Sequence, residues 1–260
     1  KRLAYKDPSA PFKPNQYLIL KDSMNPNHTA MGRYSKELDC IVPIFKPVEG
    51  LWGIFPKNAE QAFAIDALLN DDIKLISLVG KAGTGKTLLA VQNGIKLFQD
   101  GLVDKIVVTR PAVSVDEDLG FLPGDLNEKM APWTRPIFDV FQEYYQQKEI
   151  AKMLEEGVIE ISPLAYMRGR TFKNAYIVAD EMQNCTQTQM KMILTRIGEN
   201  TRLFITGDLE QCDRVDYPNG LEDFLDKIRC RRSNSISSVE FQREDIERED
   251  VVKEVLDIYA

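Results

Sequence analysis

A glycine-rich stretch, LVGKAGTGKT at residues 78–87, has the residue types and the spacing that hold a phosphate group. The pattern G-x-x-x-x-G-K-[ST] is met by Gly80, Gly85, Lys86 and Thr87. Glycines let the backbone wrap a phosphate with its N–H groups pointing inward, and the following helix presents the positive end of its dipole. Lys86 would contact the β- and γ-phosphates, and the Thr87 hydroxyl would be a ligand of Mg²⁺. A glycine-rich turn without a ligand is the alternative, which the position between a predicted strand and a predicted helix disfavours.

The residues of this loop that we expect to bind a nucleotide are Gly80, Lys81, Ala82, Gly83, Thr84, Gly85, Lys86 and Thr87.

A hydrophobic run that ends in two acids, AYIVADE at residues 175–181, provides the acidic half of such a site. Asp180 would hold Mg²⁺ through its water shell, and Glu181 would polarise the attacking water as a general base. An acid directly after the Mg²⁺ acid favours hydrolysis over phosphoryl transfer to a bound acceptor. Two solvated acids at a strand end are the alternative, which the preceding phosphate loop disfavours.

A third stretch, FITGDLEQ at residues 204–211, also ends a core strand. If that strand lies between the phosphate-loop strand and the Asp180 strand, Thr206, Asp208 and Gln211 face the γ-phosphate. These side chains would then report whether the γ-phosphate is present. A simple turn built on the Gly-Asp pair is the alternative.

Gln61 lies on a predicted helix before the phosphate-loop strand, within FPKNAEQAFAIDALL. A glutamine amide has a donor and an acceptor, which match the N6/N7 edge of adenine. We therefore include Gln61 in the nucleotide site. A solvent-exposed glutamine is the alternative, and the sequence alone favours it.

The elements that must position these residues change character near residue 52. Residues 1–52 hold prolines and two short β-like runs, QYLIL (16–20) and GRYSKELDCIVPI (32–44), around a polar turn. We expect a small antiparallel extension or connector there, followed by the main domain at residues 53–260.

Apolar strands alternate with helices through the main domain. Five runs predict core strands: IKLISLVG (73–80), KIVVTR (105–110), AYIVAD (175–180), RLFITGD (202–208) and ISSVEF (236–241). Helical patterns cover 58–69, 86–98, a stretch through 156 that follows a Pro/Gly-rich segment at 111–136, 187–198, 219–228 and 249–260. This order predicts a doubly wound α/β fold with a mostly parallel sheet.

Composition excludes several classes of protein. The 260 residues are 43% hydrophobic, and no apolar run approaches the roughly 18 residues that cross a bilayer. There is no signal-peptide pattern, the four cysteines have no paired spacing, and the only histidine is His28. We therefore expect a cytoplasmic protein with reduced thiols, no zinc site and no membrane partner. The net charge of −7 means that nucleic acid would have to bind a local basic patch.

Together, the four stretches resemble the first motor domain of a superfamily 1 helicase, and further stretches resemble the PhoH family of ATPases. The latter are WGIFPKNAEQ, LVGKAGTGKTLLA, TRPAVSVDEDLGFLPG, PWTRPIFD, YMRGRTF, DEMQN, TGDLEQCD and VEFQREDIEREDVV. The resemblance implies a RecA-like P-loop NTPase domain over 53–260 that uses ATP and Mg²⁺ and works on single-stranded RNA as an oligomeric ring, a hexamer. By position, it implies that Gly80 to Thr87 bind the nucleotide, Asp180 the metal, and that Glu181 is the catalytic acid.

Two positions depart from the family pattern, and the start of the chain adds an expectation. Met182 replaces an alanine, which should affect packing more than chemistry, and Glu249 stands where a histidine often follows Arg248. The second departure puts the role of that segment in doubt. Residues 13–50 resemble the connector of PhoH proteins with an N-terminal PIN ribonuclease domain. The start at Lys1 fits such a domain upstream but does not demonstrate it.

The sequence holds one P-loop, whereas a helicase-type motor needs a second lobe that presents an arginine to the phosphates. We therefore expect a neighbouring subunit to supply this arginine. Arg168 and Arg170 are the first candidates because Gly169 lets the backbone approach a neighbour, and Arg214 and Arg248 are further ones. A solvated basic loop or an intrachain salt bridge is the alternative.

Contact with RNA has two candidate segments. The long stretch 109–136 holds Arg110, Trp133 and Arg135, which could stack on bases or pair with phosphates, although it also carries acids. KIRCRRSN (227–234) is the densest basic patch, and a solvated loop is the favoured alternative.

Two competing functions remain open. One is a nucleotide-gated binding or assembly module with slow ATPase and no unwinding, which RNA-stimulated turnover would separate from a motor. The other is a small-molecule kinase, which the ADE and TGDxxQ stretches argue against.

Overall fold

The computed structural model describes residues 3–4, 12–45, 51, 53–111, 126–212, 218–231 and 233–241, with only the backbone described for 3–4 and 126–133. Within these residues, no helix is both long and apolar enough to cross a membrane. The predicted helix 249–260 and the arginines at 214 and 248 lie outside the described residues.

A six-stranded parallel sheet forms the centre of the described chain, in the order β10-β5-β9-β8-β6-β7. The strands are β5 (Leu75–Val79), β6 (Lys105–Arg110), β7 (Ile159–Pro163), β8 (Ala175–Ala179), β9 (Arg202–Gly207) and β10 (Ile236–Glu240). Every residue of β5, β8 and β9 is buried, which is typical of parallel strands covered on both faces. The predicted parallel α/β fold is confirmed, and β9 lies between β5 and β8 as the site prediction requires.

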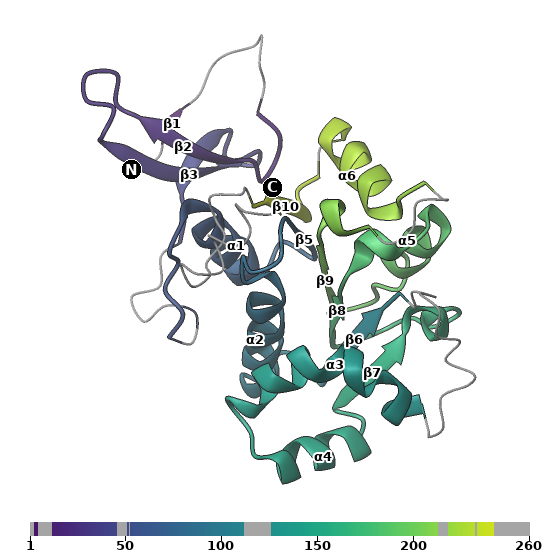
Figure 1. Ribbon diagram of the computed structural model, residues 1–260. Helices are drawn as coiled ribbons and strands as arrows, with labels where there is room; N and C mark the ends of the chain where they lie inside the picture. Colours follow the sequence, from purple (N-terminus) through teal and green to yellow (C-terminus); the bar gives the residue numbers. More distant parts are fainter. Residues whose placement is uncertain are drawn as a thin grey trace, which may run out of the picture.

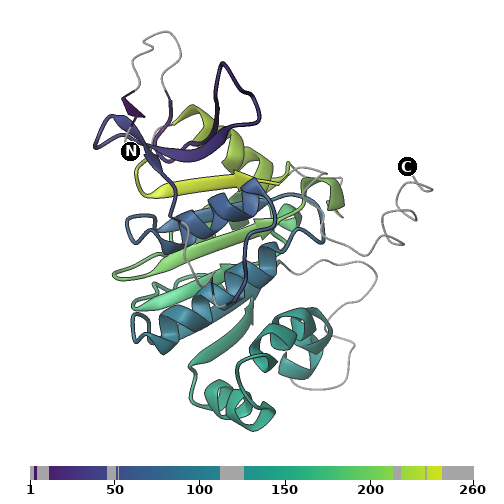
Figure 2. The same cartoon turned by 90° about the vertical axis from the view of Figure 1, so that its left-hand side faces the viewer.

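Helices cover both faces of this sheet (Figures 1 and 2). Strand residues alternate between two cores: Ile76 and Leu78 belong to the core beneath α1 and α2, and Leu75 and Val79 to the core beneath α5 and α6. The helices are α1 (Ala59–Leu69), α2 (Lys86–Gln99), α3 (Leu126–Gln142), α4 (Gln147–Glu155), α5 (Gln187–Leu194) and α6 (Gly220–Cys230). The two-sided burial holds the carboxyl ends of β5, β8 and β9 at one edge, where their loops meet.

Helix α2 lies directly on β8 because residue 94 is a glycine. A Cβ atom at Gly94 would lie 2.7 Å from Cδ1 of Tyr176, closer than side chains can pack. The Tyr176 hydroxyl accepts a hydrogen bond from Asn93 at 3.4 Å, and burial raises the pKa of Tyr176 well above its ordinary value. This close contact fixes the second half of α2 over the sheet.

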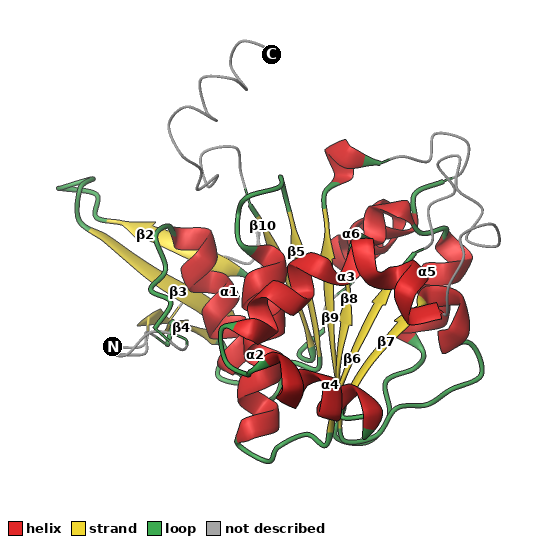
Figure 3. Cartoon of the chain, turned by 60° about the horizontal axis from the view of Figure 1, so that its bottom comes forward, coloured by secondary structure: helices red, strands yellow, loops and turns green. Residues whose placement is uncertain are grey.

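A small antiparallel sheet precedes the main one, where the sequence predicts a β-rich extension (Figure 3). Its strands are β1 (Leu3–Ala4), β2 (Tyr17–Lys21), β3 (Thr29–Ser35) and β4 (Cys40–Pro43), in the order β1-β4-β3-β2.

This extension is fastened to α1 by the buried carboxylate of Asp66. Asp66 accepts hydrogen bonds from the Tyr17 hydroxyl at 2.9 Å, from Arg33 Nε at 3.0 Å and from the Phe45 backbone N–H at 2.7 Å. The Tyr17 ring stacks on Phe63 with 4.9 Å between ring centroids, and burial raises the pKa of Tyr17 well above its ordinary value. The extension is therefore joined to the helix that carries Gln61.

Three details of the main domain differ from the sequence predictions. Strand β7 was not predicted, because five residues between a helix and a turn give only a short alternation. Helix α3 begins at Leu126, inside the segment predicted to be irregular, and includes two prolines. Its buried residues Ile137 and Phe141 pack into the core, and this packing outweighs the hydrogen bonds that the prolines remove. Helix α5 ends at Leu194, four residues earlier than predicted.

Candidate nucleotide-binding site

The phosphate loop joins β5 to α2 in a backbone conformation that needs its glycines. The backbone φ angles are +152° at Gly80, +88° at Gly83 and +84° at Gly85, values that residues other than glycine rarely adopt. At Gly80 a Cβ atom would also lie 2.6 Å from Cβ of Phe241, the residue that follows β10. The glycine positions that define the sequence pattern are therefore required by the backbone.

Lys86 folds back over this loop. Its Nζ donates hydrogen bonds to the carbonyl oxygens of Gly80 at 2.6 Å and Lys81 at 2.7 Å, and Thr84 Oγ1 lies 3.4 Å away. The residue is 8% exposed. A buried ammonium at the mouth of a phosphate loop is placed to meet an anion there.

Asp180, at the end of β8, is brought to the start of α2. Its Oδ1 accepts a hydrogen bond from Thr87 Oγ1 at 3.1 Å and another from the Thr206 hydroxyl, and the residue is 5% exposed. A carboxylate and a hydroxyl at this distance are hard oxygen donors that fit a Mg²⁺ ion completed by phosphate and water. Within the described residues, no cluster of three or more His, Cys, Asp or Glu side chains could hold a metal ion by itself, so phosphate and water would have to complete the coordination.

Glu181 follows Asp180 in a left-handed backbone conformation, with φ at +52°. Its Oε1 lies 3.2 Å from an Arg110 guanidinium nitrogen, and its Oε2 accepts a hydrogen bond from Gln183 Nε2 at 2.5 Å. Uncommon backbone angles at non-glycine residues cluster at functional sites. The side chain is turned toward the carboxyl edge of the sheet and is held from two sides.

Gln183 joins Glu181 to the segment that follows β9. The sequence did not lead us to predict a role for this residue. Its Nε2 also donates to the carbonyl oxygen of Gln211 at 3.2 Å, and its Oε1 accepts from the Asp208 backbone N–H at 3.1 Å. It is 2% exposed. The neighbouring Met182 is fully buried in the core under α5 and α6, so its substitution for alanine concerns packing.

The segment after β9 is tied to the phosphate loop. Asp208 Oδ2 accepts a hydrogen bond from the Ala82 backbone N–H at 3.1 Å, and Glu210 forms an ion pair with Lys81. Thr206 and Asp208 are buried, whereas Gln211 is exposed. The stretch from Thr206 to Glu210 therefore contacts both the phosphate loop and the Asp180 carboxylate.

Gln61 lies against the phosphate loop and is not solvent-exposed. Its Oε1 accepts from the Lys57 backbone N–H at 2.9 Å, its Nε2 donates to the carbonyl oxygen of Thr84 at 3.4 Å, and the residue is 8% exposed. The first turn of α1 is capped by Asn58, which accepts the Gln61 backbone N–H at 2.8 Å. The cap positions this amide beside the loop.

A cavity of about 260 Å³ lies where these segments meet. It is lined by Ala82, Gly83, Gly85, Lys86, Thr87, Leu88, Asp180, Glu181, Thr206, Gly207, Asp208 and Gln211. Residues from three separate sequence stretches thus share one cavity.

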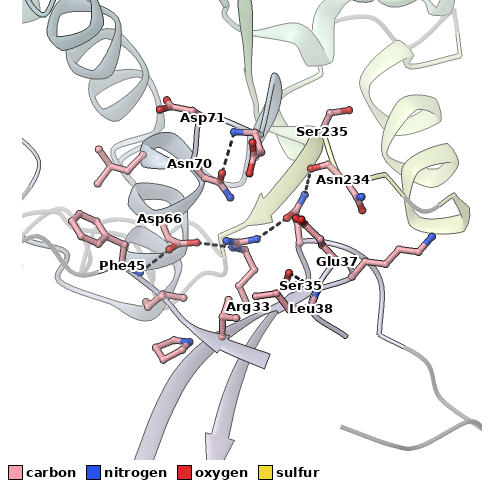
Figure 4. A pocket seen from close by; sticks show the side chains of 17 residues that line it. Arg33, Ser35, Glu37, Leu38, Phe45, Asp66, Asn70, Asp71, Asn234 and Ser235 are labelled. Atoms are coloured by element: carbon pink, nitrogen blue, oxygen red, sulfur yellow. Dashed lines mark hydrogen bonds and ion pairs between the residues drawn. The ribbon is translucent and has the colours of Figure 1, made fainter. Parts of the chain in front are cut away.

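A larger cavity of about 850 Å³ lies between the N-terminal extension and α1 (Figure 4). The half-buried Arg33 and the buried Asp66 neutralise each other there, and Arg33 Nη1 donates a hydrogen bond to Asn15 Oδ1 at 2.9 Å. Size alone does not make it the site, because it lacks the phosphate-binding backbone that the smaller cavity has.

Two of the arginines proposed to act on a neighbouring subunit, Arg168 and Arg170, follow β7 at the far side of the sheet from β5. Arg168 is exposed, while Arg170 is half-buried, forms two hydrogen bonds with Glu160 of β7 and packs on the Phe172 ring at 4.5 Å. Four strand spacings of about 4.8 Å separate β7 from β5, so β7 lies roughly 19 Å from the strand that carries the phosphate loop. The intrachain ion pair considered for this loop is present at Arg170.

The candidate RNA-contact residues are dispersed. Arg110 pairs with Glu181, which the sequence did not suggest, and Arg135 is exposed on α3. The Trp133 side chain is outside the described part. In the basic patch, Lys227 pairs with Asp223, and Arg229 pairs with Asp226 and Glu240, so acids neutralise much of its charge.

The phosphate loop after β5, the acid pair that follows β8 and the order of the parallel strands are those of a P-loop NTPase. The PhoH-like protein family matches residues 53–260, and the chain belongs to that family.

Individual relatives agree with this assignment. The chain is 41% identical to "Protein PhoH2" of Bacillus subtilis (strain 168) over 229 residues, which are 84% of this chain and 51% of that protein. It is 43% identical to a "PhoH-like protein" of the same organism, covering 78% of this chain and 63% of that protein. For "Protein PhoH" of Escherichia coli (strain K12), the identity is 40%, with 80% and 58% covered. The chain thus spans 51 to 63% of the length of these relatives.

Among solved structures, the Pif1 helicase of Candida albicans matches 79% of this chain and 43% of its own, with 16% identity and a TM-score of 0.38.

Proposed function

We propose that the chain is a Mg²⁺-dependent ATPase motor domain that acts on single-stranded RNA. The observation that carries the proposal is the approach of Thr87 Oγ1 to Asp180 Oδ1, at 3.1 Å, with Lys86 and Glu181 lining the same cavity. Lys86 and the loop N–H groups bind the β- and γ-phosphates, and Thr87 and Asp180 hold the metal. Bound Mg²⁺ neutralises charge that develops on the phosphates.

Glu181 is the residue that activates the attacking water. Once its carboxylate turns to the γ-phosphate, it orients a water for in-line attack and accepts its proton. Thr206, Asp208 and Gln211 respond to the γ-phosphate, because their segment contacts both Asp180 and the phosphate loop. Gln61 recognises the adenine edge from its place beside Thr84. On binding, the Gln61 amide would exchange its contacts with the Lys57 N–H and the Thr84 carbonyl oxygen for contacts with adenine.

The working assembly is a ring, which we propose to be a hexamer, in which Arg168 or Arg170 reaches the nucleotide of the next subunit. The support is that both arginines follow β7, which three strands separate from β5, the strand that carries the phosphate loop. An upstream PIN ribonuclease domain, joined through residues 1–52, would use the RNA that the motor delivers. The cytoplasm is the compartment that this substrate implies.

The test is steady-state ATP hydrolysis with Mg²⁺, with and without single-stranded RNA, over a series of protein concentrations. We expect RNA to raise turnover and specific activity to rise with concentration. Mixing inactive Lys86→Ala with Arg168→Ala or Arg170→Ala should restore activity if the arginine acts between subunits. RNA-independent turnover that is flat with concentration would contradict the ring motor.

A second function, a slow nucleotide-gated module, is favoured by one observation. Both oxygens of Glu181 are engaged by protein groups, which is the arrangement of a restrained base. ATP turnover that stays slow at saturating RNA would support the function of a slow nucleotide-gated module.

A further inference from the structure

Glu181 is held between two side chains that differ in how deeply they are buried. Arg110 is the last residue of β6, and Glu181 follows the end of β8, the adjacent strand. Their side chains are 27% and 32% exposed. Gln183, on the other side, is 2% exposed. The base thus has one accessible partner and one buried partner.

The arrangement has a consequence for catalysis. A carboxylate that activates water must turn one oxygen to that water, within hydrogen-bond reach. Here Oε1 faces the guanidinium at 3.2 Å and Oε2 faces the Gln183 amide at 2.5 Å. Before Glu181 can orient a water, at least one of these two contacts has to break, or its partner has to move together with the Glu181 carboxylate.

Arg110 is the partner better suited to leave. Gln183 is fixed by the Asp208 N–H and by the carbonyl oxygen of Gln211, and opening it would disturb both. Because Arg110 is partly exposed, it can exchange the Glu181 carboxylate for another anion at a lower free-energy cost than that of breaking the hydrogen bonds of the buried Gln183. Guanidinium groups bind phosphate oxygens with two parallel hydrogen bonds, which makes a nucleic-acid phosphate an effective competitor.

We propose that Arg110 is a positioning residue through which bound RNA controls Glu181, an inference that rests on the RNA-acting function proposed above. Without RNA, Arg110 holds the carboxylate in its resting orientation. When a backbone phosphate of single-stranded RNA takes the guanidinium, Glu181 is released to orient the attacking water. Binding of RNA and hydrolysis of ATP are thereby linked through one ion pair at the edge of two neighbouring strands.

The experiment compares wild type, Arg110→Gln and Arg110→Lys in ATP hydrolysis with saturating Mg²⁺-ATP, with and without poly(U). Lys152→Gln is the matched control, because Lys152 lies on α4, is 71% exposed and pairs only with Glu156 among the ion pairs of the described residues, at 3.6 Å. We expect Arg110→Gln to raise RNA-free kcat roughly fivefold, with KM for ATP unchanged, and to bring the ratio of kcat with poly(U) to kcat without it close to one. Arg110→Lys should restore part of the restraint, and Lys152→Gln should behave as wild type.

Three results would overturn the proposal. A fall in kcat of Arg110→Gln by the same factor with and without poly(U) would make Arg110 part of the ATP site itself. An unchanged RNA-free rate and activation ratio would show that the ion pair restrains nothing. If wild type hydrolyses ATP but ignores poly(U), the RNA-acting function fails and so does control by RNA. The RNA-free rate of Arg110→Gln then still reports whether the ion pair restrains the base.

Discussion

Asp208 accepts a hydrogen bond from the backbone N–H of Ala82 at 3.1 Å, and this contact joins the end of β9 to the phosphate loop. Asp208→Ala should raise the Kd for Mg²⁺-ATP about tenfold, because the half-buried Ala82 N–H loses its acceptor and the phosphate loop loses an anchor. Asp208→Asn keeps an oxygen acceptor and should lie between the two. Binding of a fluorescent nucleotide measures the effect, and an unchanged Kd for folded Asp208→Ala would contradict this role.

Gln183 should matter for turnover more than for binding. Gln183→Ala removes the contacts to Glu181, Gln211 and Asp208, so we expect kcat to fall roughly tenfold while KM for ATP changes little. Gln187→Ala, an exposed glutamine at the start of α5, is the matched control. Equal losses in kcat and in nucleotide affinity would mean that Gln183 only supports the fold.

Asp66 should stabilise the attachment of the N-terminal extension. Asp66→Asn leaves Arg33 without its buried counter-charge, and we expect the free energy of unfolding to fall by about 3 kcal/mol. Asp71→Asn is the control, since the Asp71 side chain is 83% exposed. Urea unfolding measures both variants, and equal stability for the two would contradict the structural role of Asp66.

The Glu160–Arg170 pair should make stability depend on pH. Hydrogen bonds from Arg170 lower the pKa of Glu160 below its ordinary value of 4.5. Because the folded pKa is depressed, the pair contributes stability above the unfolded pKa and loses it as the pH falls through the folded pKa. The stability difference between wild type and Glu160→Gln should therefore be constant near neutral pH and shrink below 4.5. A difference that does not change with pH would rule out this contribution.

The sequence predicted the parallel sheet, and it named most of the residues that line the cavity beside the phosphate loop, because apolar strand runs and the spacing of the motifs carry that information. A phosphate loop needs glycines at fixed positions, and parallel strands place their carboxyl ends at one edge, so Lys86, Asp180 and Thr206 could be brought together without a structure. Gln61 was the weakest of these predictions, and it does lie beside the loop, held by a cap that the sequence also contains.

The missing parts depend on neighbours that no local pattern reveals. Gln183 acts through three partners in a turn, and the pairing of Arg110 with Glu181 requires knowing that β6 and β8 are adjacent. Strand β7 is too short to stand out, and it is what places Glu160 beside Arg170.

The central claim is that Glu181 activates water at a site where Lys86 binds the nucleotide. The most direct measurement compares Mg²⁺-ATP binding and single-turnover hydrolysis in wild type, Lys86→Ala and Glu181→Gln. We predict that Lys86→Ala fails to bind ATP, and that Glu181→Gln binds ATP as wild type does but hydrolyses it at least 10³ times more slowly, to order of magnitude. Hydrolysis by Glu181→Gln at about the wild-type rate would contradict the account.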